Sequence, residues 1–441
     1  MKKKKRIKSK TLLNAIIFFL IIQLIPLFAL WIIPVEPEIY NSSEYYFAML
    51  LFIVFTTLSF VFMYTLTYRT IKLRNRNFDE YNQFSIKQLN FNSKLIFITS
   101  ILGLLLMLYD RIYVRGINYS LGLRNARYQW LYSEVSSSIW SKIGNLLVPF
   151  GYVGLWFLLV HKNKLKTIQK FQLGIAAVCT VLGHAALNGG RSQVLLGAVL
   201  WIAIKMIMIF RNDCNKVKEK ILEKAKKNMI LIFAGLFVVL LTLDGIGKDM
   251  DLKSYIINFA PTLLGSVNLD KVNILSFLGA FGYMMTFITM YLLHGQYSFR
   301  YVFSLNDTEG YAFFGTLLNP FIQILKTLGF SLNSIQKDFF TTEYAIFLSL
   351  PGAFFYDFGY VGLIVLSLLL GIVFAIAILT IKFSKIITGY KLAFIMFVLF
   401  YIILSPVMSA SGFAYFYFII YAFITIETIN RFKYRKKINW M

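Results

Sequence analysis

The chain has 441 residues, of which 58% are hydrophobic and only 15% are charged, and its formal net charge is +25. So apolar a composition excludes an ordinary soluble domain. The positive charge is spread over short segments between apolar runs, which argues against nucleic acid as a partner. Apolar runs long enough to span a bilayer recur along the whole chain. We therefore expect one integral membrane domain over residues 1–441.

Ten segments are predicted to cross the membrane as helices, which makes the chain an all-α polytopic membrane protein. They are Leu12–Ile33, Tyr46–Leu66, Lys94–Tyr109, Ile139–Val160, Phe171–Leu187, Gln193–Phe210, Met229–Leu243, Tyr360–Ile381, Lys391–Ser409 and Phe413–Ile429. The lysine-rich start before the first run is typical of a signal peptide. That run is longer than a signal peptide's apolar region and no small-residue cleavage site follows, so we interpret it as an uncleaved anchor.

The distribution of charged residues along the chain predicts the orientation of the protein in the membrane. With the N-terminus in the cytoplasm and the sides alternating, most lysine and arginine residues fall on the inner side and the outer segments are slightly acidic. Membrane proteins show this bias, so we expect both termini in the cytoplasm.

An arginine-rich outer loop is expected over residues 110–138, between the third and fourth spans. It contains Arg111, Arg115, Arg124 and Arg127 and no lysine before Arg127. The first two arginines are four residues apart and the last two are three apart, so each pair can share one helix face. Guanidinium groups match phosphate oxygens in pairs, which favours binding of an outer phosphate or diphosphate. The alternative is contact with anionic lipid heads, or pairing with Asp110 and Glu134.

A tight outer turn follows the fifth span, in the sequence LNGGRSQ. Gly189 and Gly190 allow close approach of a ligand to the backbone, and Arg191 follows them as a candidate ligand-binding residue. The alternative is a plain turn in which Arg191 extends towards the membrane surface. His184, seven residues earlier, is expected to be a hydrogen-bonded interior histidine.

The longest loop, residues 244–359, is predicted to be a large outer region partly embedded in the membrane. Ile274–Leu293 is apolar enough to cross, whereas Tyr311–Leu332 is amphipathic and contains Pro320. Two crossings here give twelve spans, and a re-entrant or surface-lying pair leaves ten. Loops of this length are usually functional.

Three residues of this late region are candidate site residues. His294 is expected to face outwards, where it can act as a general base or be an interfacial histidine without a role. Arg300 lies shortly after it as a candidate substrate-binding residue. Asp357 lies directly before the span predicted from Tyr360, where it can act as a base or, as we prefer, orient one of the outer arginines. No metal-type Cys/His spacing occurs, and no metal or cofactor is predicted.

Three segments carry a resemblance to a known family. They are YDRIYVRGINYSLGLRNARYQW, LNGGRSQVLLGAVL and FFYDFGYVGLIVLSLLLGIV, in this order. Together they resemble the Wzy-type polymerases of bacterial O-antigen and capsule repeat units. Arg111 is followed by ten residues and then Gly122, which is similar to an Arg-x10-Gly pattern of such polymerases. From Arg300, Gly310 comes one residue too early for a second copy.

The resemblance implies a metal-independent glycosyltransferase with a GT-C-like fold in the bacterial inner membrane. Its substrates would be glycans on undecaprenyl diphosphate, and a chain-length regulator protein would be a partner. The acceptor's hydroxyl would attack the donor's anomeric carbon while lipid diphosphate leaves. Three alternatives stay open: an O-antigen ligase, a flippase for lipid-linked oligosaccharides, and a secondary transporter.

Overall fold

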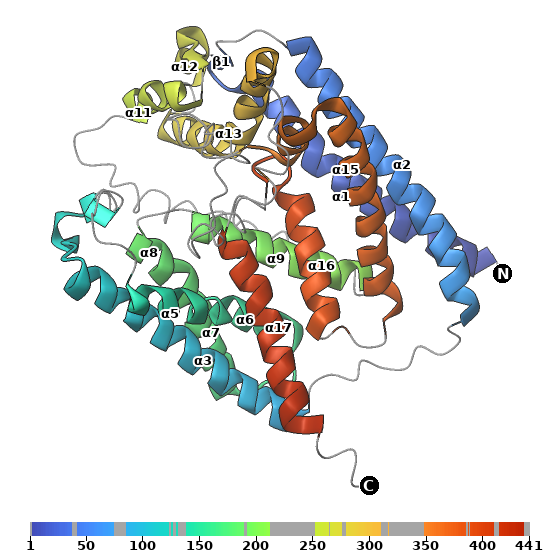
Figure 1. The fold of residues 1–441 in the computed structure, drawn as a ribbon, viewed down its shortest axis with the longest axis vertical. Coiled ribbons are helices and arrows are strands. Elements are labelled where there is room, and N and C mark those ends of the chain that lie inside the picture. Colours follow the sequence, from blue (N-terminus) through green and yellow to red (C-terminus); the bar gives the residue numbers. More distant parts are fainter. Residues whose placement is uncertain are drawn as a thin grey trace. The chain divides into compact units, whose positions relative to one another are not determined.

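Helices make up nearly all of the part of the chain that the computed structural model describes (Figure 1). The described residues are 2–37, 42–74, 85–122, 125–126, 129–130, 138–188, 192–211, 252–263, 265–275, 279–309, 316, 348–384, 387, 389–409 and 414–435. The chain is thus an all-α membrane protein, and its described residues include a short two-stranded sheet.

Seven segments of the described residues are long and apolar enough to cross a membrane. They are Thr11–Ile32, Ser43–Thr70, Ile86–Val114, Ile139–Val160, Thr167–Asn188, Gln193–Arg211 and Leu350–Phe383. Each coincides with a span predicted from the sequence. The last one starts at Leu350 because a short helix precedes it. The backbone is non-helical at Gly359 (φ 64°), and the longer helix follows from Tyr360, the predicted start.

The remaining predicted spans have different outcomes. Helix α16 (Gly389–Leu404) is apolar but has 16 residues, so it is shorter than a usual crossing. Helix α17 (Ala414–Arg435) covers the predicted tenth span and α13 (Gly279–Glu309) covers most of the ambiguous late segment, but neither is among the seven. The predicted span Met229–Leu243 lies outside the described residues.

The chain divides into two compact units. Unit 1 comprises residues 1–76, 248–379 and 398–414, and unit 2 comprises residues 77–247, 380–397 and 415–441. Helix α15 (Leu350–Phe383) and helix α16 contribute residues to both units.

The described part of unit 1 contains four long helices, α1 (Lys2–Ile32), α2 (Ser42–Arg74), α13 and most of α15, and a set of shorter elements. Its elements before α15 are α1, β1 (Val35–Pro37), α2, α11 (Leu252–Phe259), η4 (Ala260–Leu263), β2 (Gly265–Val267), α12 (Leu269–Leu275) and α13. Strands β1 and β2 are antiparallel, with Val35 opposite Val267. Aromatic rings join the long helices: Phe60 of α2 lies 4.8 Å from Phe374 of α15, centroid to centroid.

Irregular backbone lies buried between helices in unit 1. The N–H of Leu350, where α15 begins, donates to the carbonyl of Ser405 at 2.8 Å, and the N–H of Ser409 donates to the carbonyl of Leu348 at 2.6 Å. Gly295 of α13 packs so tightly here that a Cβ atom would lie 2.1 Å from the Val407 carbonyl oxygen. These bonds satisfy backbone groups that would otherwise be costly in a membrane.

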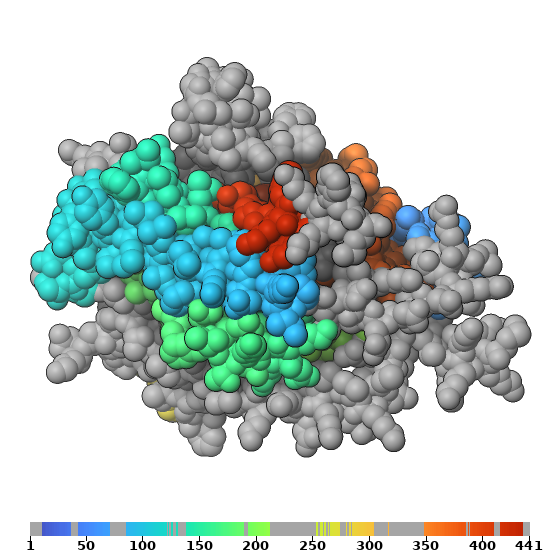
Figure 2. Space-filling view, turned by 90° about the horizontal axis from the view of Figure 1, so that it is seen from below, coloured from blue at the N-terminus to red at the C-terminus, as the bar shows by residue number. Residues whose placement is uncertain are grey.

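Unit 2 contains the described elements that follow α2 and precede α11 in the chain. They are α3 (Ile86–Tyr109), η1 (Asp110–Val114), η2 (Tyr119–Leu121), α5 (Ile139–Leu147), α6 (Phe150–Val160), α7 (Thr167–Val178), η3 (Cys179–Gly183), α8 (His184–Asn188) and α9 (Ser192–Arg211). Helix α3 lies between α5 and α7 on the face seen in Figure 2. Its outer side exposes Ile98, Leu102 and Leu105, as suits a surface against lipid.

Side-chain caps define where α3 and α5 begin. Helix α3 begins with a capping box, in which Ser85 and Gln88 each bind the other's backbone N–H. Helix α5 begins at Ser138, whose hydroxyl accepts the N–H of Ser141 at 3.2 Å. Gly144 lets α5 approach α3 closely, since a Cβ there would lie 2.9 Å from the Gly103 carbonyl oxygen. A hydrogen bond from Ser138 to Asp110, the residue that follows α3, places the end of α3 beside the start of α5.

Candidate functional site: a buried arginine centre

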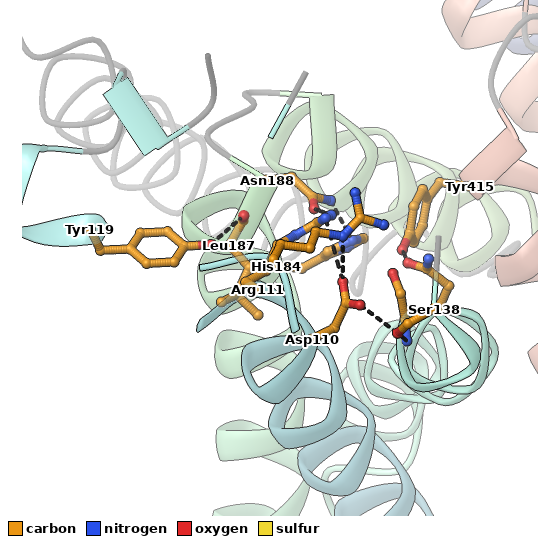
Figure 3. A network of polar contacts seen from close by, with 11 residues as sticks. Asp110, Arg111, Tyr119, Ser138, His184, Leu187, Asn188 and Tyr415 are labelled. Carbon is orange, nitrogen blue, oxygen red and sulfur yellow. Dashed lines mark hydrogen bonds and ion pairs between the residues drawn. The ribbon is translucent and has the colours of Figure 1, made fainter. Parts of the chain in front are cut away.

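Two π-helical turns lie among the described residues of unit 2, each next to polar residues. Helix α3 continues into the π turn η1, which starts with Asp110 and Arg111. The second π turn, η3, leads directly into α8, which starts with His184 and ends with Asn188. Such turns are rare and occur often at functional sites. Figure 3 shows that the side chains of these four residues converge on one place.

Asp110 is fully buried and binds three side chains. Its Oδ2 lies 3.0 Å from Nε of Arg115 and 3.6 Å from Nη1 of Arg111. Its Oδ1 accepts a short hydrogen bond from the Ser138 hydroxyl. A buried carboxylate is stable only with such partners, so Asp110 links both guanidinium groups to the start of α5.

Arg111 is 2% exposed and lies at the centre of the cluster. Its Nη2 donates to Oδ1 of Asn188 at 3.0 Å. Its guanidinium carbon lies 4.4 Å from the centroid of the Trp130 ring, a cation–π contact. Among the residues that the structure describes, Nε and Nη1 of Arg111 have no hydrogen-bond partner.

Asn188 fixes the proton on His184. Arginine can only donate, so the oxygen of the Asn188 amide must face Arg111 and the NH2 group must face His184. Nδ2 of Asn188 lies 2.7 Å from Nε2 of His184, and Nε2 must accept this bond. His184 is therefore neutral with its proton on Nδ1. Within the described part of the chain, that Nδ1 has no hydrogen-bond partner.

Two tyrosines close the cluster. The ring of Tyr415, in α17, lies 4.2 Å from the His184 ring, and its hydroxyl binds Oδ1 of Asn145 by a short hydrogen bond. The Tyr119 hydroxyl donates to the Leu187 carbonyl at 2.8 Å. Burial raises the pKa of Tyr119, and the positive charge of Arg111 opposes that shift. Both tyrosines act as neutral hydrogen-bond donors.

We call Asp110, Arg111, Arg115, His184 and Asn188 the Arg111 centre. Two guanidinium groups and one carboxylate leave it with one net positive charge, because His184 is neutral. Nε and Nη1 of Arg111 and Nδ1 of His184 add three buried donors without a hydrogen bond in the described ranges. Each unsatisfied buried donor costs about 1–3 kcal/mol. An anionic ligand with several acceptor oxygens would satisfy both the charge and the donors.

The structure brings together part of the predicted arginine set. Arg111 and Arg115 lie side by side on Asp110, which is also the pairing considered as an alternative to ligand binding. Arg124, Arg127, Arg191 and Glu134 lie outside the described residues. His184 is a hydrogen-bonded interior histidine, as expected.

Arg300, His294 and Asp357 belong to unit 1 rather than to the unit of the Arg111 centre. Arg300 is 9% exposed, donates to the Tyr46 hydroxyl at 2.9 Å, and lies 4.7 Å from the centroid of the Tyr45 ring. It is held by aromatic side chains within the described residues.

The candidates His294 and Asp357 are both buried. His294 is 5% exposed inside α13, next to the tightly packed Gly295. Asp357 lies in the short first part of α15, two residues before the kink at the non-helical Gly359, and so directly precedes the longer helix predicted from Tyr360. Its carboxylate accepts the N–H of Thr316 at 3.0 Å and the Thr316 hydroxyl at 2.8 Å. These contacts orient Thr316.

Four residues of the site were missed from the sequence: Asn188, Ser138, Tyr119 and Tyr415. The spacing of His184 and Asn188, four residues apart before the glycine turn, was the available signal for the first. The others contact the site only through tertiary packing. No group of three or more His, Cys, Asp or Glu side chains in the described residues could hold a metal ion.

Comparisons of the chain with models of protein families, with curated proteins and with solved structures found no match.

Proposed function

We propose that this protein polymerises oligosaccharide repeat units carried on undecaprenyl diphosphate, as the Wzy-type polymerases of O-antigen and capsule do. The observation that carries the proposal is the Arg111 centre, a buried cationic group at the end of an apolar span. Buried charge inside a membrane protein is costly, so it usually serves a ligand or a pathway.

The reaction joins two lipid-linked glycans. A hydroxyl oxygen of the acceptor forms a bond to the donor's anomeric carbon, the bond from that carbon to the diphosphate oxygen breaks, and the hydroxyl proton passes to a base. Diphosphate is a good leaving group, and cationic donors that bind its growing charge lower the barrier. In this proposal Arg111 and Arg115 bind the leaving diphosphate. Arg124, Arg127 and Arg191 are further candidate ligands.

The membrane arrangement belongs to the same proposal. The protein would have ten to twelve spans in a GT-C-like fold, lie in the bacterial inner membrane with both termini in the cytoplasm, and act on its outer face. The seven apolar helices and the inward bias of basic residues support this arrangement. A chain-length regulator protein would be its partner.

Deletion of the gene tests the proposal. We expect cells without the protein to carry a single repeat unit on their acceptor and to lose the long-chain ladder on a polysaccharide gel. An unchanged ladder would overturn the proposal. Loss of even the single unit would also overturn it and would indicate a ligase or a flippase instead.

A further inference from the structure

His184 is the uncharged residue of the Arg111 centre that has a side-chain nitrogen without a hydrogen bond in the described residues. It is fully buried, and its Nε2 is occupied by Asn188 at 2.7 Å. One face of the ring lies against Tyr415, with 4.2 Å between centroids. The Nδ1–H group is left as a buried donor without an acceptor in that part of the structure.

Arg111 determines the position of the proton on His184 through the Asn188 amide between them. Arg111 turns the oxygen of the Asn188 amide towards itself, and the amide then presents its NH2 group to Nε2 of His184. A neutral histidine in this environment can only donate from Nδ1. The Asn188 amide thus orients the guanidinium group of Arg111 and fixes the tautomer of His184.

We propose that His184 is a further binding residue of this site, which donates its Nδ1–H to the same phosphate-bearing ligand that Arg111 binds. Asn188 is then a positioning residue, because it fixes the tautomer that makes this donation feasible. The inference rests on the proposed function for the identity of the ligand, a prenyl diphosphate. The chemistry itself requires only a phosphate or diphosphate group.

A leaving diphosphate can accept hydrogen bonds from a neutral donor and from cationic donors at the same time. Arg111 and Arg115 supply charge, whereas His184 supplies a directed hydrogen bond that does not depend on a further buried cation. A hydrogen bond to a charged group contributes a factor of roughly ten to one hundred in binding. We therefore expect His184→Phe, which keeps a ring against Tyr415, to weaken diphosphate binding at least about tenfold.

Nuclear magnetic resonance of histidine nitrogens in the purified protein in detergent tests the inference directly. The chain has only three histidines, so labelling with ¹⁵N-histidine gives few signals, and His184→Phe assigns the one that disappears. We expect His184 of the unmodified protein to carry its proton on Nδ1. A proton on Nε2 alone, or on both nitrogens, would overturn the inference.

Ligand titration separates the possible sources of phosphate. Inorganic pyrophosphate and geranyl diphosphate should shift the Nδ1 signal of His184 in the unmodified protein and not in Arg111→Gln. A shift with phosphatidylglycerol but with neither diphosphate would support the His184 contact and overturn the proposed function. Binding of a diphosphate without any shift at Nδ1 would overturn the His184 contact and leave the proposed function standing.

Asn188→Asp tests the positioning role. A carboxylate has no proton to give, so Nε2 of His184 should gain one. Asn90→Asp is the matched control, because it adds a carboxylate on the same helix as Asp110, at an exposed position where Asn90 already accepts from Gln169. Nε2 of His184 should stay unprotonated in the control. An unprotonated Nε2 in Asn188→Asp would overturn the role of Asn188.

Discussion

Arg111 donates a hydrogen bond of 3.0 Å to Asn188, a residue 77 positions later in the sequence. The bond joins the end of one apolar span to the end of another, and both partners are at most 7% exposed. It holds a guanidinium group in a fixed direction while leaving Nε and Nη1 without a hydrogen bond among the described residues. An arginine fixed in this way is ready to bind an anion without reordering its own side chain.

Replacing Arg111 by lysine should impair polymerisation. Lysine keeps the charge, but its single ammonium cannot reproduce the planar fork that contacts Asn188, Asp110 and the Trp130 ring. We expect Arg111→Lys to reduce polymer formation by roughly ten- to hundredfold at normal protein levels, as measured from ladder length and immunoblots. Arg431→Lys is the control, because Arg431 is an exposed arginine paired with Glu427 and should tolerate the change. Full-length ladders in Arg111→Lys would contradict the role of the guanidinium.

Removal of the buried carboxylate should destabilise unit 2. Asp110→Asn leaves Arg111 and Arg115 close together without the negative charge that lies between them. Loss of one partner from a buried ion pair costs about 3–5 kcal/mol in the free energy of unfolding. Unfolding in detergent should show this loss, and the double variant Asp110→Asn with Arg115→Met should regain part of it. Equal stability of Asp110→Asn and the unmodified protein would show that the carboxylate is not needed.

Acidic pH should lower the stability of the protein against unfolding through His161. Burial is the main reason that the pKa of His161 is lowered to about 4, and nearby Lys164 adds to the effect. Between the ordinary histidine pKa near 6.5 and pH 4, the unfolded chain binds a proton that the folded chain does not, so stability falls as the pH falls. The loss approaches about 3 kcal/mol at the acid end. Thermal unfolding of His161→Gln should depend less on pH over this range, and identical pH profiles would refute the assignment.

Close packing at Gly295 should not tolerate a methyl group. Alanine there would place its Cβ 2.1 Å from the Val407 carbonyl oxygen, so the buried backbone of unit 1 would have to shift. We expect Gly295→Ala to lower the free energy of unfolding by about 1–3 kcal/mol or more. Gly174→Ala is the control, since a Cβ at this helical glycine meets nothing within 4 Å and alanine favours a helix. Comparable stability of the two variants would contradict the packing argument.

The predicted orientation can be checked with single cysteines. In a chain whose Cys179 and Cys214 are replaced, cysteines at Ser42 and Ser137 should react with an impermeant maleimide from outside. Cysteines at Asn75 and Asn215 should react only after the membrane is opened, because basic segments stay in the cytoplasm. Labelling of Ser137 from the inside alone would place the Arg111 centre on the wrong side for a lipid-linked substrate.

The sequence alone determined the membrane class and seven of the spans. A bilayer requires about 20 consecutive apolar residues, and this is a local property that composition in a window reveals. The span predicted from Tyr360 follows the kink at Gly359, whereas the short helix before that kink was missed because its aromatic residues are compatible with either a loop or a helix. The burial of His294 was missed because it depends on neighbours such as Gly295 and Val407, which come together only in the fold.

The sequence also indicated that Arg111 and Arg115 belong together, since four residues separate them on one helical stretch. Only the tertiary structure decided their partners. Asn188 and Tyr415 reach the Arg111 centre because helices far apart in the chain pack side by side, and hydrogen bonds form over about 3 Å regardless of sequence distance. Local pattern thus determined which segments enter the membrane, whereas packing decided which buried polar groups meet there.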